Sequence, residues 1–222
     1  PATCEDQKLN QDEIAVDCGG RNCIACAIKN LLPVSANIIT LFSAPNGNAS
    51  VLLRIENPNE GYGVARLRYV VKLYGAGGEA LIEDAHETAI GAQDIKTVVV
   101  PGLLVRLSDV FRSEIMLGDY TWTEEDILGI LHPRVREIKT VIGANGVSIS
   151  GVVENVGSRI VRKGILSVVV RDKRGLFVTG SRTIIENVEA FGSARFLLLI
   201  PLVKDERDSV DVDATNVFIE GE

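Results

Sequence analysis

The chain has 222 residues, of which 46% are hydrophobic and 24% charged, and its net charge is −7. Such a composition can bury two modest cores and is not that of a disordered chain. The acidic balance argues against a nucleic-acid partner, which needs a basic patch. No stretch reaches the roughly 18 apolar residues of a membrane-spanning helix. We therefore expect a folded protein with no nucleic-acid partner and no transmembrane segment in this chain.

All four cysteines lie near the start of the chain, at Cys4, Cys18, Cys23 and Cys26. An even number of clustered cysteines is typical of a small disulfide-stapled module in an oxidising compartment. The alternative is a zinc site, since Cys23 and Cys26 form a C-x-x-C pair. The spacing of the first two cysteines supplies no second close pair, so we favour two disulfides in a module over 1–32. The three pairings that four cysteines allow remain open.

The same module carries four oxygen-bearing side chains, Asp6, Asn10, Glu13 and Asp17. If the segment were helical, their spacing would place them on one face. Three carboxylates on one face repel one another unless a hard cation such as calcium neutralises them. The alternative is a solvated acidic face without a metal, which we favour because the segment does not match an EF-hand loop. No other cofactor is expected.

The rest of the chain repeats itself after about 98 residues. VLLRIEN at 51–57 is echoed by ISGVVEN at 149–155, and the copies end in VVVP at 98–101 and LLIP at 198–201. A period near 100 residues has the size of a domain, whereas solenoid repeats have about 20–50 residues. The sequence therefore predicts two copies of one domain, spanning 33–132 and 133–222.

Strict alternation of apolar and polar residues over 64–74 indicates a half-buried strand. It follows a second alternating segment, 51–56, after a turn that contains proline and glycine. The second copy repeats the plan, with alternation over 166–170 before a turn at 172–175. Short strands joined by turns, with almost no helical periodicity, predict an all-β fold of two tandem immunoglobulin-like β-sandwiches.

One segment departs from the strand pattern. Thr123, three acidic residues and an apolar run that ends at His132 predict a short helix or turn that bridges the sandwiches. Trp122 precedes this segment and is the single tryptophan. We expect it to fill the interdomain joint, with a ligand-stacking platform as the alternative.

Two groups of residues resemble known families. The cysteine segment, with DCGG at 17–20, resembles a short motif of secreted and surface-attached bacterial and archaeal proteins, from which it departs at Gln7, where the motif has glycine. The strand and turn residues at 149–157 are similar to the FxLYD family of extracellular immunoglobulin-like domains. Residues 55–59 are similar to the sandwich of late-embryogenesis-abundant proteins. These resemblances imply a sandwich fold and an extracellular location, and they imply no active site.

The sequence carries no catalytic motif. Its two histidines, His86 and His132, lie in no metal-binding or nucleophile pattern, and no G-x-S-x-G, P-loop, dinucleotide fingerprint or H-E-x-x-H occurs. We therefore expect a non-enzymatic protein. The favoured hypothesis is an extracellular structural or adhesive surface protein that assembles into a filament. The alternative is a solute- or glycan-binding accessory module, which would present an aromatic-lined face, whereas aromatic residues make up 5% of this chain.

Two apolar runs, 98–100 and 196–200, lack the alternation of a strand with one solvated face. They predict that another domain or subunit covers some outer sheet surface. We expect self-association in which a terminal segment, either Pro1 to Leu32 or Ser209 to Glu222, docks on a neighbouring copy.

Overall fold

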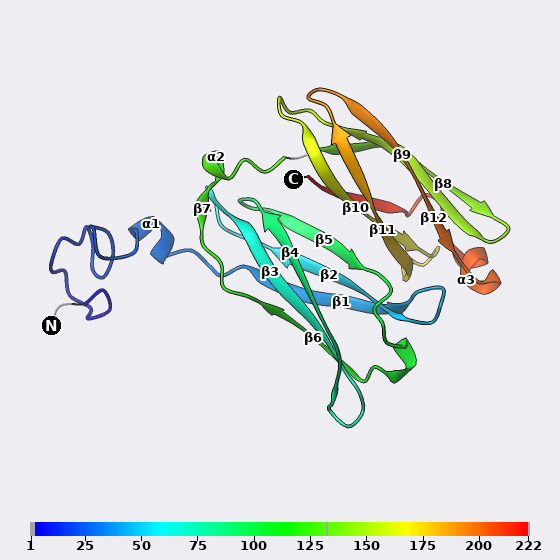
Figure 1. Ribbon diagram of the computed structural model, residues 1–222, viewed down its shortest axis with the longest axis horizontal. Helices are drawn as coiled ribbons and strands as arrows, with labels where there is room; N and C mark the ends of the chain where they lie inside the picture. Colours follow the sequence, from blue (N-terminus) through cyan, green and yellow to red (C-terminus); the bar gives the residue numbers. More distant parts are fainter. Residues whose placement is uncertain (1–2, 132, 222) are drawn as a thin grey trace.

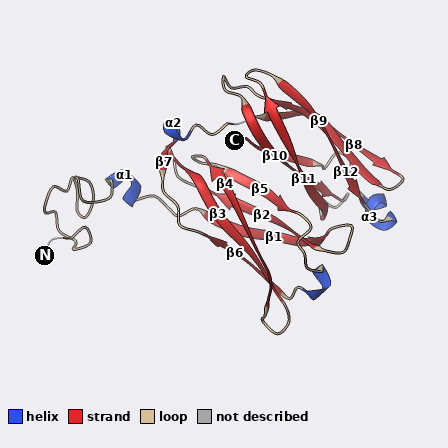
Figure 2. Ribbon diagram, in the orientation of Figure 1, coloured by secondary structure: helices blue, strands red, loops and turns tan. Residues whose placement is uncertain are grey.

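The computed structural model describes residues 3–131 and 133–221. His132, at the expected boundary between the two domains, lies outside these ranges, as do Pro1 and Glu222, the outer limits of the expected docking segments. The fold is all-β, with antiparallel sheets preceded by a disulfide-linked N-terminal module (Figures 1 and 2). This confirms the fold class predicted from the sequence.

The elements fall into two successive groups. The first group is α1 (Cys26–Lys29), β1 (Ser35–Ser43), β2 (Ala49–Glu56), β3 (Tyr62–Tyr74), β4 (Ala80–Ile90), β5 (Ile95–Val100), the 3-10 helix η1 (Leu107–Asp109), β6 (Arg112–Leu117), β7 (Thr123–Glu124) and α2 (Glu125–Leu128). The second group is β8 (Arg134–Gly143), β9 (Gly146–Glu154), β10 (Val161–Arg171), β11 (Phe177–Val188), β12 (Ser193–Pro201), α3 (Lys204–Ser209) and β13 (Asn216–Gly221).

Both groups have the same sheet plan. In the first group, β1-β2-β5 form one sheet and β4-β3-β6 form the other, with β7 paired to β3. In the second group, β8-β9-β12 and β11-β10-β13 follow the same order. Strand by strand, β8 to β13 correspond to β1 to β6. The sequence repeat is therefore a repeat of topology.

Each pair of sheets encloses its own apolar core, which makes each group a β-sandwich. Side chains of β2 and β3 alternate along the strand, and every second one, such as Leu53 or Leu67, is buried in the first core. Ile149 and Leu166 hold the equivalent places in the second core. Burying one such side chain stabilises the fold by about 1.5–3 kcal/mol. The arrangement is compatible with the expected immunoglobulin-like sandwich.

A buried asparagine closes one end of the first sandwich. Asn57 Nδ2 donates to the carbonyl oxygens of Tyr62 at 2.7 Å and Gly91 at 2.6 Å. Its Oδ1 accepts from the backbone N–H of Asn59 at 3.1 Å and from the Asn59 side chain at 2.9 Å. One side chain therefore ties the β2–β3 turn to the β4–β5 turn.

Asn155 occupies the same position 98 residues later and makes the same kind of bonds. Its Nδ2 donates to the carbonyl oxygens of Arg159 at 2.7 Å, Val188 at 3.1 Å and Glu189 at 3.0 Å. Its Oδ1 accepts from the backbone N–H of Gly157 at 3.0 Å. The asparagine that ends both repeated strings thus has one structural role in both sandwiches.

The two sandwiches pack on each other through a third apolar cluster. Phe42, Leu52 and Val99 on the outer face of β1-β2-β5 contact Val169 of β10, and Phe177 of β11 packs against the same cluster. The rings of Phe42 and Phe177 lie 4.7 Å apart between centroids. The first sandwich therefore presents one sheet face to its own core and the other face to the second sandwich.

This packing explains the first doubly apolar run, 98–100. Val98 and Val100, the first and last residues of the run, face the core of the first sandwich. Val99 between them is buried in the joint. The backbone N–H of Val99 also donates to Ser167 Oγ across the joint at 3.4 Å. The covering predicted for this surface is thus supplied by the other domain and not by another subunit.

The predicted bridging helix is shorter than the apolar run suggests. Thr123 does not cap it, because Thr123 and Glu124 are paired with β3 as the strand β7. The helix α2 starts at Glu125 and ends after Leu128, where Gly129 adopts a left-handed conformation with φ of 63°. A glycine in this conformation ends a helix without the steric cost of a side chain.

Trp122 does not lie in the joint, and the C-terminal strand pairs within its own chain. Trp122 packs against the core of the first sandwich, edge-on to Tyr120 at 5.3 Å between ring centroids, whereas smaller side chains and two phenylalanines fill the joint. The C-terminal segment, Ser209 to Glu222, was one of two candidates for docking on a neighbour. Its strand β13 instead pairs with β10 and completes a sheet of its own chain.

Candidate functional site

The N-terminal module is held by two disulfides, Cys4–Cys23 and Cys18–Cys26. The described residues contain no free cysteine, so the zinc alternative is wrong. Among the described residues before Val34, Cys18 is the one buried apolar residue. The module is therefore held together by its disulfides and not by an apolar core. Sequence spacing could not select this pairing, because it depends on how the turns fold back.

The acidic residues of the module bind backbone amides. The segment forms turns and not a helix, so the expected helical face does not exist. The carboxylate of Asp17 accepts from the backbone N–H of Gln7 at 3.0 and 3.1 Å, and Glu13 accepts from that of Asn10 at 3.0 Å. Asn10 Nδ2 donates to Asp6 at 2.9 Å. These bonds satisfy backbone groups that a short chain cannot pair in a sheet.

The turn after Asp6 forms although the motif's glycine is replaced. Gln7 adopts a left-handed conformation with φ of 61°, and Asp6 Oδ1 accepts from the backbone N–H of Lys8 at 3.0 Å. In the described part of the chain, one metal-sized group of ligand atoms occurs, formed by Cys4, Glu13 and Cys23. Its two sulfurs are bonded to each other and are not free to bind a metal. Calcium binding by the acidic side chains stays the alternative to an acidic face without a metal.

The module lies apart from both sandwiches, at one end of the long axis of the molecule (Figure 1). Its exit is fixed, because Leu32 and the buried Asn59 exchange two hydrogen bonds, at 2.8 and 2.7 Å, and the backbone N–H of Val34 donates to the Tyr120 hydroxyl at 2.8 Å. Its surface carries several exposed apolar side chains: Leu9, Ile14, Val16 and Ile24. The module therefore projects from the sandwiches and carries exposed apolar side chains on its surface.

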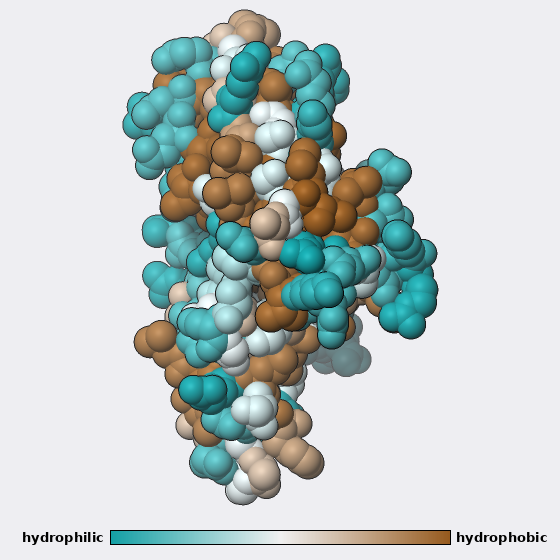
Figure 3. All heavy atoms as spheres, turned by 90° about the vertical axis from the view of Figure 1, so that its right-hand side faces the viewer, coloured by the Kyte–Doolittle hydropathy of each residue, from teal (hydrophilic) through white to brown (hydrophobic). Residues whose placement is uncertain are grey.

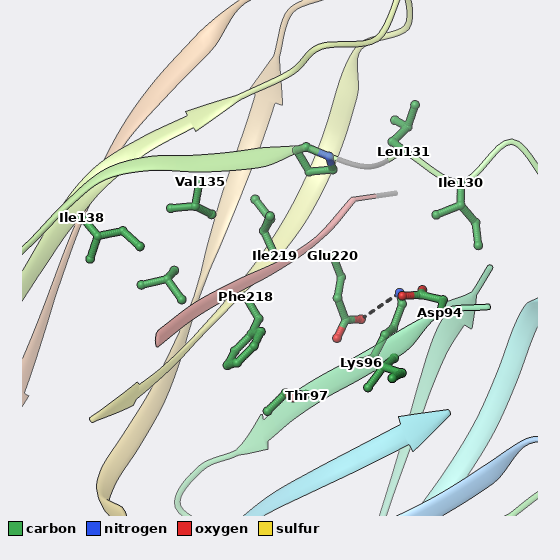
Figure 4. A pocket seen from close by; sticks show the side chains of 13 residues that line it. Asp94, Lys96, Thr97, Ile130, Leu131, Val135, Ile138, Phe218, Ile219 and Glu220 are labelled. Atoms are coloured by element: carbon green, nitrogen blue, oxygen red, sulfur yellow. Dashed lines mark ion pairs between the residues drawn. The ribbon is translucent and has the colours of Figure 1, made fainter. Parts of the chain in front are cut away.

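The polar edge of the joint is a small cavity of about 290 Å³, shown in Figure 4. Lys96 of β5 and Glu220 of β13 form an ion pair across it at 3.6 Å, with side chains only 10% and 12% exposed. Thr88 Oγ1 donates to Glu220 at 2.7 Å. The ion pair and this hydrogen bond join the second sandwich to two strands of the first. They stabilise a fixed orientation of the two units.

Three titratable residues of β3 and β4, Tyr69, Asp84 and His86, are in contact through His86. His86 Nε2 lies 2.8 Å from Asp84, and the imidazole stacks on Tyr69 at 5.2 Å between ring centroids. Burial, followed by the nearby Glu220 carboxylate, raises the pKa of Tyr69, so its hydroxyl stays protonated near neutral pH. The histidine thus contacts a carboxylate and an aromatic ring, and its contacts account for its position structurally.

The outer face of β8-β9-β12 is uncovered and carries exposed apolar side chains. In the run 196–200, alternate residues enter the second core, but Leu197 and Leu199 point outward and are 63% and 67% exposed. Val141 on β8 is 45% exposed on the same face. Figure 3 looks at this end of the molecule and shows hydrophobic side chains gathered in its upper half, with hydrophilic ones around them. The sequence indicated this surface through the doubly apolar run.

Comparison with known proteins assigns no family to the chain. No protein-family model matches the chain, and no curated protein matches it. The solved structures that the comparison returned include the crystal structure of red sea bream transglutaminase, which is 13% identical with a TM-score of 0.29. The match covers 87% of this chain and 32% of that one, so the chain spans about a third of that structure's length. None of the described helices has the length and apolarity that crossing a membrane requires.

Proposed function

We propose that this chain is a non-enzymatic, extracellular structural or adhesive surface protein that assembles with copies of itself into a filament. The observation that carries the proposal is the uncovered apolar face of β8-β9-β12. The equivalent face of the first sandwich is buried by the second sandwich, whereas this one is open, with Leu197 and Leu199 exposed. Exposed apolar patches of this kind mark interaction surfaces.

Three further features support a structural role outside the cell. Two disulfides persist in oxidising compartments and are rare in the cytosol. The joint of Val99, Val169 and the ion pair of Lys96 with Glu220 make the two sandwiches a rigid spacer. His86 contacts Asp84 and stacks on Tyr69, and we assign it a structural role and not that of a general base. The proposed assembly requires no cofactor.

The test is the mass of the chain in solution as a function of concentration, measured by light scattering. We expect the mass to rise above that of a 23.9 kDa monomer as the concentration increases. A constant monomer mass up to millimolar concentration contradicts the proposal. Circular dichroism is the control for folding: the sandwiches should remain folded when the disulfides of the module are reduced, because both disulfides lie within the module.

A second function is solute binding, favoured by a groove of about 630 Å³ between α2 and the second sandwich. Apolar side chains such as Leu128 and Ile130 line it together with Arg159 and Arg162. No aromatic ring is among the described lining residues, so the chemistry suits an apolar anion better than a glycan. Calorimetric titration with dodecanoate tests this function: saturable binding that Arg162→Ala weakens supports it, and the absence of heat contradicts it.

A further inference from the structure

We propose that the N-terminal module of one copy docks on the outer face of β8-β9-β12 of the next copy, so that the copies join head to tail. This inference rests on the proposed self-assembly and names the two surfaces that make the contact. The partner is a second copy of this chain, because the chain itself carries a surface that matches the open face in both apolarity and charge.

The open face is the structural equivalent of a face that the chain already uses for packing. In the first sandwich, Leu52 of β2 lies opposite Val99 of β5, and both are buried in the joint. In the second sandwich, Ser150 of β9 lies opposite Leu197 of β12. Because β9 repeats β2 and β12 repeats β5, Leu197 stands where Val99 stands. The same sheet face is covered in one sandwich and exposed in the other.

The open face is also basic, although the chain as a whole is acidic. Arg136 of β8 and Arg195 of β12 lie in one register row on either side of Val152. In the next row, Lys139 and Leu197 lie on either side of Ser150. All three basic residues are exposed. Glu154 pairs with Arg136 at 2.9 Å, but basic residues still exceed acidic ones on this face. A complementary partner therefore has apolar side chains and a net negative charge.

The other large faces of the chain do not meet these requirements. The outer face of β4-β3-β6 is covered by ion pairs, in which Glu87 binds Arg66 and Arg68, and Lys72 binds Glu83. Two open faces packed on each other would bring like charges together, which is unfavourable. The facing sheets of the joint are already buried. Sheet-on-sheet contact between copies is therefore disfavoured.

The N-terminal module meets both requirements. Residues 3–32 contain five acidic and three basic side chains. Apolar side chains on its surface include Ile14, which is 79% exposed, and Leu9, which is 62% exposed. The module lies at the opposite end of the long axis from β8, β9 and β12 (Figure 1). A contact between opposite ends, repeated in one direction from copy to copy, propagates into an open filament.

Two matched variants test the inference. Leu197→Ser/Leu199→Ser removes apolar contact from the face, and Leu9→Ser/Ile14→Ser removes it from the module, without changing charge. Each variant alone should associate about a hundredfold more weakly than the unaltered chain, because each loses two apolar side chains from the contact. The control Leu104→Ser/Phe111→Ser alters side chains that are 89% and 78% exposed in the first sandwich. It should associate like the unaltered chain.

Mixing the two variants distinguishes head-to-tail docking from other contacts. The face variant keeps an intact module and the module variant keeps an intact face, so an equimolar mixture should sediment as a dimer while each variant alone sediments as a monomer. A mixture that stays monomeric overturns the inference, as does assembly of either variant at the strength of the unaltered chain. Those outcomes leave the proposed self-assembly standing. If the unaltered chain is monomeric at every concentration, the proposed function fails together with the inference.

Discussion

Replacing the buried asparagine of the first sandwich should destabilise the fold strongly. In Asn57→Ala, two carbonyl oxygens and two N–H groups lose the partners that the asparagine side chain provides. One such bond contributes about 1 kcal/mol net, and a buried group left unpaired costs about 1–3 kcal/mol. Since water entering the vacated space satisfies some of these groups, we expect a loss of roughly 3 kcal/mol from a stability of about 5–15 kcal/mol.

Urea unfolding monitored by circular dichroism measures this loss. The control is Asn37→Ala, an exposed asparagine on β1, which should change the free energy of unfolding by less than about 0.5 kcal/mol. If Asn57→Ala loses no more stability than this control, the asparagine does not tie the two turns together and the reasoning is refuted. Asn155→Ala should destabilise the chain by a similar amount, because its side chain makes equivalent bonds in the second sandwich.

Three further predictions concern the module and a turn. The change Cys4→Ser/Cys23→Ser should expose the module to protease while the urea midpoint of the sandwiches stays the same, since the module adds little to their cores; a large drop of that midpoint would contradict this. Digestion of the module should be equal with and without a calcium chelator, because Asp17 and Glu13 already bind backbone amides; faster digestion with chelator would support a calcium site. Burial raises the pKa of Asp172, but N–H groups of Leu176 and Arg174 and the Arg174 guanidinium outweigh it and hold the value below its usual range. Asp172 therefore stabilises the fold above its unfolded pKa of about 3.9. The stability advantage of the unaltered chain over Asp172→Asn should shrink as the pH falls below the unfolded pKa, and an advantage that does not change with falling pH would refute the assignment.

The sequence was most informative where periodicity reflects packing. The alternation over 64–74 predicted which side chains of β3 enter the core, and the repeat predicted that β9 copies β2. The doubly apolar runs pointed to outer faces that need cover. The runs do not indicate what covers these faces. The second sandwich covers Val99, whereas Leu197 is uncovered within this chain.

Features that depend on folded geometry were beyond the sequence. The four cysteines allow three pairings, and the turns around Gln7 and Asp17, both with positive φ, decide which sulfurs meet. Trp122 was expected in the joint from its position between two domains. It packs on Tyr120 because the chain before α2 is still paired to β3. Helical spacing of the acidic residues did not apply, since their segment folds as turns.

Electron microscopy of the negatively stained chain at high concentration tests the central claim most directly. The proposed head-to-tail assembly predicts unbranched filaments. In them, successive pairs of sandwiches follow one another at a uniform spacing, with a disulfide-linked module between them. Dispersed single particles at the same concentration, each with the size of one 23.9 kDa chain, would contradict it.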